Sequence, residues 1–235
     1  MLGLVLPPLL FLAVLGRQVV AGGPLVAADE RLARTMRADS PPTALAEILA
    51  DLGNPEVALP VLAAAVAYAG WRGRRWWPPL AAVAAMAAAP VVVVPLKALT
   101  DRPGPLGGTG YFPSGHATTA VVAYGAAALL VLPYVRPSVR RPLLAATALL
   151  CAAAGAGLVW RGYHWPLDVL GGWCLGGPLL VAVRCRAAPS SSGPVPVGRA
   201  PRHTGTVVVS SDRPDPPGPP GPSGPERSNS QKAKS

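Results

Sequence analysis

Two short stretches of the chain combine histidine with residue types that suit a phosphate site. In "PSGH", Ser114 and Gly115 come directly before His116 at the start of an apolar run. In "WRGYHWPLD", His164 precedes Asp168 by four residues. Residues four apart share one face of a helix, so the carboxylate can hold one imidazole nitrogen and leave the other free to attack. Alone, such a pair is more often structural, and the second histidine cluster strengthens the catalytic interpretation.

A third stretch, "KALTDRPGP", adds the cations Lys97 and Arg102. Taken alone, such side chains are more often interfacial residues whose charged ends reach water, but two cations can also neutralise several phosphate oxygens. Ser114 by itself is an ordinary N-cap for the helix that follows. A helix N-terminus also binds oxyanions through its backbone N–H groups, and Gly115 would let that backbone approach the anion. Together the three stretches predict a phosphate site.

The elements that must position these stretches are long apolar segments. Of the 235 residues, 51% are hydrophobic and 14% are charged, which is about half the charged fraction of an ordinary soluble domain. The mean hydropathy is +0.37. Each segment approaches the roughly 20 residues that a helix needs to cross a bilayer, so we expect an all-α integral membrane bundle of about six transmembrane helices. The expected spans are residues 2–22, 54–71, 77–97, 116–134, 142–160 and 166–184.

The formal net charge of +10 does not indicate a nucleic-acid partner, because the basic residues lie in short clusters between apolar segments and in the C-terminal region. Three arginine clusters fall on one side of a six-span arrangement, which predicts that this side is cytoplasmic. Segments 97–116 and 160–166 then share the external face and bring the two histidine motifs together there. The arginines that set this orientation are Arg72, Arg74, Arg75, Arg136, Arg140, Arg141, Arg184 and Arg186.

Composition divides the chain into three parts. We expect residues 1–53 to hold the first transmembrane helix and an external amphipathic segment, and residues 54–186 to form the membrane core that carries the chemistry. Residues 187–235, which include His203, read as a disordered cytoplasmic tail rich in Pro, Gly and Ser. The first apolar run resembles a signal peptide, but Arg17 follows that run instead of preceding it, which favours a retained span. The spacing of the three cysteines indicates neither a disulfide framework nor a metal site.

The order Lys…Arg-Pro, Pro-Ser-Gly-His and His-Trp-Pro-x-Asp resembles the type 2 phosphatidic acid phosphatase (PAP2) superfamily, which also includes vanadium haloperoxidases. The resemblance covers about residues 54–184. It implies that His164 is a nucleophile that forms a phosphohistidine, that Asp168 orients it, and that His116 is the general acid. It also implies that the reaction needs no metal and no other cofactor. The residues that it assigns to the phosphoryl oxygens are Lys97, Ser114 and Gly115.

Two positions depart from the family pattern. In the family an arginine usually follows the lysine after six residues, and counting from Lys97 places Gly104 there, with Arg102 two residues earlier. In the third motif, Leu158 stands where an arginine is usual, a glycine precedes it in place of the common serine, and Arg161 lies three residues later. Arg102 and Arg161 are therefore the candidate replacements for phosphate binding. A charge-assisted hydrogen bond contributes about 1.5–3 kcal/mol, so losing two without replacement would slow the reaction about a hundredfold to ten-thousandfold.

The resemblance implies a membrane lipid phosphatase that hydrolyses a lipid phosphomonoester or pyrophosphate, with the bilayer and the lipid phosphate as its partners. Candidate substrates are undecaprenyl pyrophosphate, phosphatidic acid and phosphatidylglycerol phosphate. The bias toward Ala, Arg, Pro and Gly suggests a bacterial genome of high GC content, which favours the first candidate by analogy only. The missing arginines keep open an impaired relative that binds or moves phospholipid. Six spans disfavour a soluble-type haloperoxidase, and charges at helix ends disfavour a transporter.

Overall fold

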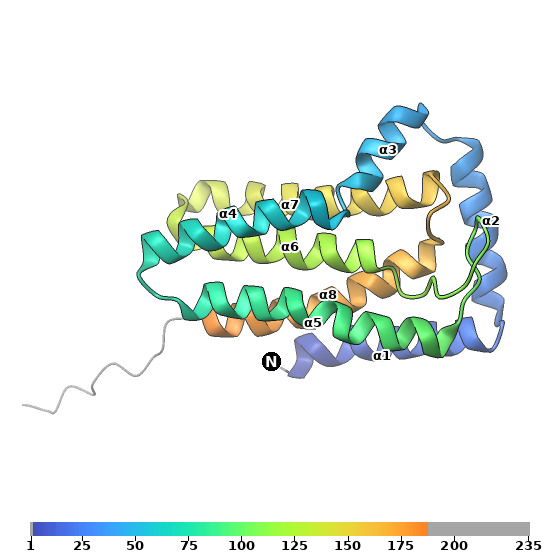
Figure 1. Ribbon diagram of the computed structural model, residues 1–235, viewed down its shortest axis with the longest axis horizontal. Helices are drawn as coiled ribbons and strands as arrows, with labels where there is room; N and C mark the ends of the chain where they lie inside the picture. The colour runs from blue at the N-terminus through green and yellow to red at the C-terminus, as the bar shows by residue number, and fades with distance from the viewer. Residues whose placement is uncertain (1, 188–235) are drawn as a thin grey trace, which may run out of the picture. The chain divides into compact units, whose positions relative to one another are not determined.

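The computed structural model describes residues 2–187, and within that range helices are the only regular elements. Long helices lie side by side, and α2 and α3 lie at one end of them (Figure 1). The expected all-α bundle is confirmed. The helices are α1 (Leu2–Val20), α2 (Pro24–Ala38), α3 (Thr43–Asp51), α4 (Pro55–Gly73), α5 (Trp77–Thr100), α6 (Gly115–Val131), α7 (Pro137–Trp160) and α8 (Pro166–Ala187), with a 3₁₀ turn at Leu132–Tyr134.

The six expected spans coincide with six of these helices. Helices α1, α5, α6, α7 and α8 are each long and apolar enough to cross a bilayer, and α4 qualifies together with α3, from which it is bent by 45°. Proline does not interrupt α5: Pro78 and Pro79 occupy its first turn, where a missing N–H costs little. Pro90 and Pro95 lie inside α5, which is tolerated where neighbouring helices in a membrane bundle satisfy the freed carbonyls.

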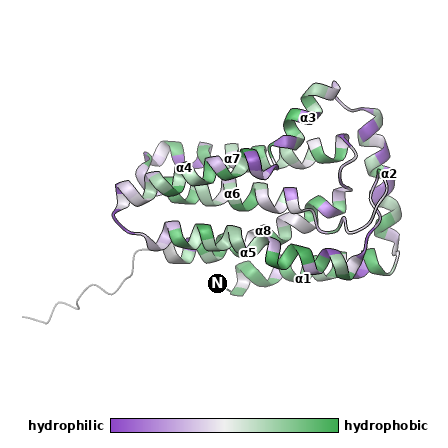
Figure 2. Ribbon diagram, in the orientation of Figure 1, coloured by the Kyte–Doolittle hydropathy of each residue, from purple (hydrophilic) through white to green (hydrophobic). Residues whose placement is uncertain are grey.

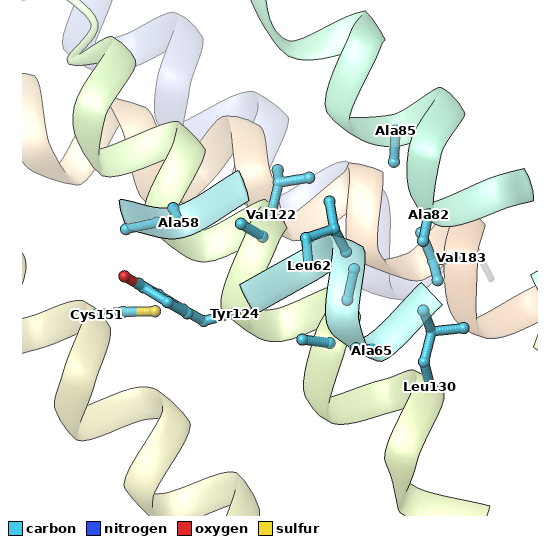
Figure 3. Packing of buried hydrophobic residues seen from close by; sticks show 14 of the residues in the cluster. Ala58, Leu62, Ala65, Ala82, Ala85, Val122, Tyr124, Leu130, Cys151 and Val183 are labelled. Atoms are coloured by element: carbon cyan, nitrogen blue, oxygen red, sulfur yellow. The ribbon is translucent and has the colours of Figure 1, made fainter. Parts of the chain in front are cut away.

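The core of the bundle surrounds α6, which contacts α4, α5, α7 and α8. Alanine and glycine allow this, because small residues let neighbouring helices approach closely in a membrane bundle. Leu62 of α4, Val122 and Tyr124 of α6 and Val183 of α8 belong to one buried cluster (Figure 3). The Tyr124 hydroxyl donates a 2.6 Å hydrogen bond to the backbone oxygen of Leu52, just after α3. Helix α6, which begins within the PSGH motif, is thus packed against four neighbouring helices.

The polar segment between the first two spans forms α2 and α3. Hydrophilic residues are prominent on α2, whereas the long helices are mainly hydrophobic (Figure 2). Helix α3 packs so closely on α7 that a Cβ added at Gly157 would lie 2.4 Å from the backbone nitrogen of Ala50. Helix α2 buries the carboxylate of Asp29, which is 4% exposed. Both helices therefore bring groups to the end of the bundle where the histidine motifs lie.

The arginine clusters that set the predicted orientation lie at the opposite end of the bundle. Arg72 and Arg74 flank the α4–α5 connection, Arg136 precedes α7, and Arg184 lies in the last turn of α8 (Figure 1). The arginine clusters and the histidine motifs thus lie at opposite ends of the bundle. That the arginine end faces the cytoplasm stays a prediction. The predicted tail, apart from its first residue at the end of α8, lies outside the described residues.

Candidate active site

The starts of α6 and α8 meet at the polar end of the bundle. Ser114 caps α6, because its hydroxyl oxygen accepts a hydrogen bond from the Ala117 nitrogen at 3.2 Å. The backbone nitrogen of Ser114 donates to the backbone oxygen of Asp168 at 2.9 Å, which joins the two helix starts directly. Ser114 is completely buried and does not line the cavity described below. The structure therefore gives its hydroxyl a capping role in place of the expected phosphate contact.

His164 and Asp168 form the pair that their spacing predicts. The distance from His164 Nδ1 to Asp168 Oδ2 is 3.2 Å. The same oxygen accepts a 3.0 Å hydrogen bond from the backbone nitrogen of Trp165, and Asp168 is 0% exposed. A carboxylate only accepts hydrogen bonds, so Nδ1 carries the proton of a neutral imidazole and Nε2 has a free lone pair. The arrangement thus fixes the orientation of the His164 imidazole and leaves Nε2 without a hydrogen bond to Asp168.

A cavity of about 1610 Å³ brings the second histidine and the lysine to the same place. His116, His164, Lys97 and Gly115 all line it. The imidazole centroids of His116 and His164 lie 6.2 Å apart, and the Tyr111 ring lies 5.6 Å from that of His164. Lys97 Nζ donates a 2.8 Å hydrogen bond to the backbone oxygen of Gly110, which leaves its other N–H groups for an anion.

Arg102 does not take the phosphate-binding position that the sequence suggests for it. Its guanidinium group is 3% exposed and lies between two carboxylates. Nη1 donates to Asp168 at 2.6 Å, and Nη2 donates to Asp29 at 2.5 Å. Arg102 does not line the cavity. Both hydrogen bonds hold the guanidinium group against buried carboxylates, which disfavours the expected phosphate contact.

Arg161 also lies elsewhere than expected. Its Nε donates to the carboxylate of Glu47 on α3, and its guanidinium group lies 5.5 Å from the centroid of the Tyr163 ring. Glu47 and Tyr163 line the cavity, whereas Arg161 does not. Leu158, in the position of the usual arginine, contributes an apolar side chain to the wall. Within residues 2–185, Lys97 is thus the only lysine or arginine in the cavity lining.

Several residues at this end escaped the sequence analysis. Asp29 is the most important, and nothing in its mixed-charge stretch separates it from the neighbouring Glu30, which is only partly buried. Asp29 Oδ1 accepts a 2.8 Å hydrogen bond from the backbone nitrogen of Leu167, in the first turn of α8. Burial raises the pKa of the Asp29 carboxyl, and the hydrogen bond from Arg102 acts in the opposite direction. Asp51, the last residue of α3, also lines the cavity and was missed.

Comparison with known protein families supplies the decisive observation: the PAP2 superfamily model matches residues 106–188. The second half of the chain thus resembles the PAP2 superfamily. The matched region contains the PSGH motif and the His164–Asp168 pair, and it begins after the Lys97–Arg102 stretch. The PAP2 resemblance noted in the sequence is therefore confirmed, and the stretch in which Arg102 departs from the family spacing lies outside the match.

A solved PAP2 structure has the same fold. The crystal structure of a transmembrane PAP2-type phosphatidylglycerolphosphate phosphatase from Bacillus subtilis matches with a TM-score of 0.71 and 21% sequence identity. The alignment covers 79% of this chain and 96% of that one. A search of curated protein sequences finds no significant match. With its membrane-length helices and this fold, the chain is a multi-pass membrane protein.

Proposed function

We propose that the chain is a membrane lipid phosphatase. The observation that carries this proposal is the set of residues that line the cavity. It begins at the two histidines and continues between α4 and α5, lined by apolar side chains such as Leu59, Val66 and Met86, as far as Trp76 near the start of α5. A phosphate group at the histidines and a hydrocarbon chain between the helices would together match this lining.

The proposed reaction uses His164 as a covalent catalyst. Nε2 attacks the phosphorus atom, the bond from phosphorus to the leaving oxygen breaks as the P–N bond forms, and His116 donates a proton to that oxygen. Water then attacks the phosphohistidine and gives up its proton to His116, which releases inorganic phosphate and restores His164. The support is the free Nε2 of His164 and the presence of both imidazoles in one cavity wall. We propose that no metal takes part.

The charges of the cavity bear on the substrate. Lys97, Gly115 and the backbone at the start of α6 are the proposed phosphate contacts, and the carboxylates of Glu47 and Asp51 lie in the same wall. With so little positive charge, the site should favour the substrate that brings the fewest negative charges. Among the three candidates this ranks a lipid phosphomonoester, such as phosphatidic acid, above undecaprenyl pyrophosphate. We place the site on the external face, as the arginine distribution predicts.

The test of this proposal is phosphate release from a panel of lipid phosphates by detergent-purified protein in the presence of EDTA. Ala63 of α4 lines the groove and Ala64 does not, so Ala63→Trp and Ala64→Trp form a matched pair. We expect Ala63→Trp to raise KM for a long-chain lipid phosphate about tenfold, equivalent to about 1.4 kcal/mol of lost binding. KM for a short-chain soluble phosphate should stay the same, and Ala64→Trp should behave as wild type. Equal effects of both variants would show that the hydrocarbon chain of the lipid does not lie in this cavity.

A second prediction separates Lys97 from Arg161. Lys97→Met is expected to lower kcat/KM about tenfold to a hundredfold, the effect of one charge-assisted hydrogen bond. Arg161→Gln removes the same charge outside the cavity and should change kcat/KM by less than about threefold, as for an exposed ion pair. The comparison is made on the same lipid phosphate at the same pH. A larger loss in Arg161→Gln than in Lys97→Met would mean that Arg161 leaves Glu47 to bind the substrate.

The scarcity of cations in the cavity also supports an alternative. A PAP2-fold protein with an impaired site would bind or move phospholipid without hydrolysing it. The same preparation decides between the two. Saturable binding of a lipid phosphate with no phosphate release, by protein that unfolds cooperatively on heating, would favour the alternative.

A further inference from the structure

Asp29 lies outside the cavity but is connected to its nucleophile. One carboxylate oxygen accepts from Leu167 N and the other from Arg102 Nη2, so both of its oxygens are occupied. Arg102 in turn donates to Asp168, which holds His164. The side chains thus form a continuous buried series from α2 to the imidazole. Neither Asp29 nor Arg102 is part of the cavity lining.

The charges along this series alternate. Asp168 carries the negative charge that stabilises a positive imidazole, and Arg102, 2.6 Å from Asp168, opposes that charge. Asp29 adds a second negative charge on the other side of the guanidinium group, where its Oδ2 lies 2.5 Å from Arg102 Nη2. With all three groups ionised the set carries one net negative charge next to His164, and without Asp29 it would be neutral. A nucleophilic imidazole becomes positively charged when it takes up a phosphoryl group, so this difference acts on the chemical step.

We propose that Asp29 is a positioning residue for the phosphatase reaction: through Arg102 it preserves the negative charge and the orientation of Asp168 that make His164 a nucleophile. The inference rests on the proposed function. It assigns a role to Arg102 as well: Arg102 holds Asp168 through Oδ1, the oxygen that His164 does not contact, and does not bind phosphate.

Other charged and titratable groups also face His164. They are His116 from α6, Tyr111 from the loop before it, Lys97 from α5, and Glu47 and Asp51 from α3. These groups come from elements other than α2, and none of them forms a hydrogen bond with Asp29. A change confined to Asp29 should therefore leave them in place.

The test compares Asp29→Asn with Glu30→Gln, a change at the partly buried next residue of α2. Asparagine keeps the shape and an oxygen acceptor, so folding should be retained. We expect kcat to fall about tenfold, equivalent to about 1.4 kcal/mol, with KM within about twofold of wild type, whereas Glu30→Gln should match wild type. An unchanged kcat in Asp29→Asn, or an equal loss of kcat in Glu30→Gln, would overturn the proposal.

A readout without substrate separates this inference from the proposed function. The chain has three histidines, so the His164 imidazole can be assigned by NMR with His164→Ala and titrated in purified protein. In Asp29→Asn it should take up its proton at a lower pH than in wild type, because a negative charge of the network is gone. If no lipid releases phosphate but the His164 titration still moves to lower pH in Asp29→Asn, the phosphatase function is rejected and the role of Asp29 is kept. An unchanged titration would reject the role of Asp29 whatever the activity.

Discussion

Replacing His164 with alanine is expected to reduce phosphate release by about 10⁴-fold or more, the size of effect seen when an enzyme loses its nucleophile. Alanine removes Nε2, the atom that would bond to phosphorus, while Asp168 keeps its hydrogen bonds to Arg102 and the Trp165 nitrogen. The fold should therefore survive. The measurement is initial-rate phosphate release in EDTA from the best lipid of the panel. Brief reaction with a lipid labelled at phosphorus, followed by denaturation, should leave acid-labile label on wild type and none on the variant.

His203→Ala is the control for this experiment, because it removes a histidine from the predicted tail. It should retain wild-type activity and labelling. His116→Ala should slow release through loss of the acid, by about 10²–10⁴-fold. Substantial release by His164→Ala would refute the covalent route and point to direct attack by water.

Replacing Arg102 with methionine is expected to destabilise the protein more than any other single change considered. The substitution leaves Asp29 and Asp168 buried without their shared cation, and breaking a buried ion pair from one side costs about 3–5 kcal/mol. The free energy of unfolding in detergent should fall by that amount. Arg34→Met is the matched control on α2, since Arg34 is 61% exposed and forms only a surface pair with Glu30. Its effect should stay below about 1 kcal/mol.

The same variant tests the correction made to the role of Arg102. A phosphate ligand at the cavity surface would raise KM on replacement and leave the free energy of unfolding nearly unchanged. If Arg102 instead belongs to the buried network, the free energy of unfolding should fall strongly and KM should change little. An Arg102→Met protein of wild-type stability and raised KM would restore the original interpretation.

Sequence reasoning succeeded where the relevant information is local. The pairing of His164 with Asp168 follows from four-residue spacing at a helix start, and the spans follow from runs of apolar residues. It could not find the ion-pair partners of the two arginines, because these partners are distant in the sequence. Arg102 binds Asp29, 73 residues away, and Arg161 binds Glu47, 114 residues away. Which cation meets which anion depends on how α2 and α3 pack across the end of the bundle, and no spacing rule encodes that packing.

The short distance between α3 and α7 limits how this chain can change in evolution. The family usually has a serine where Gly157 stands, and a Cβ there would come within 2.4–2.8 Å of Ala50 and Leu49 on α3. Restoring the serine alone would push α3 away, together with the carboxylates of Glu47 and Asp51. A lineage could regain the usual serine–arginine pair only by altering α3 at the same time. Chimaeras with PAP2 proteins should therefore exchange α3 and α7 as one block, and exchange of α7 alone should give poorly folded protein.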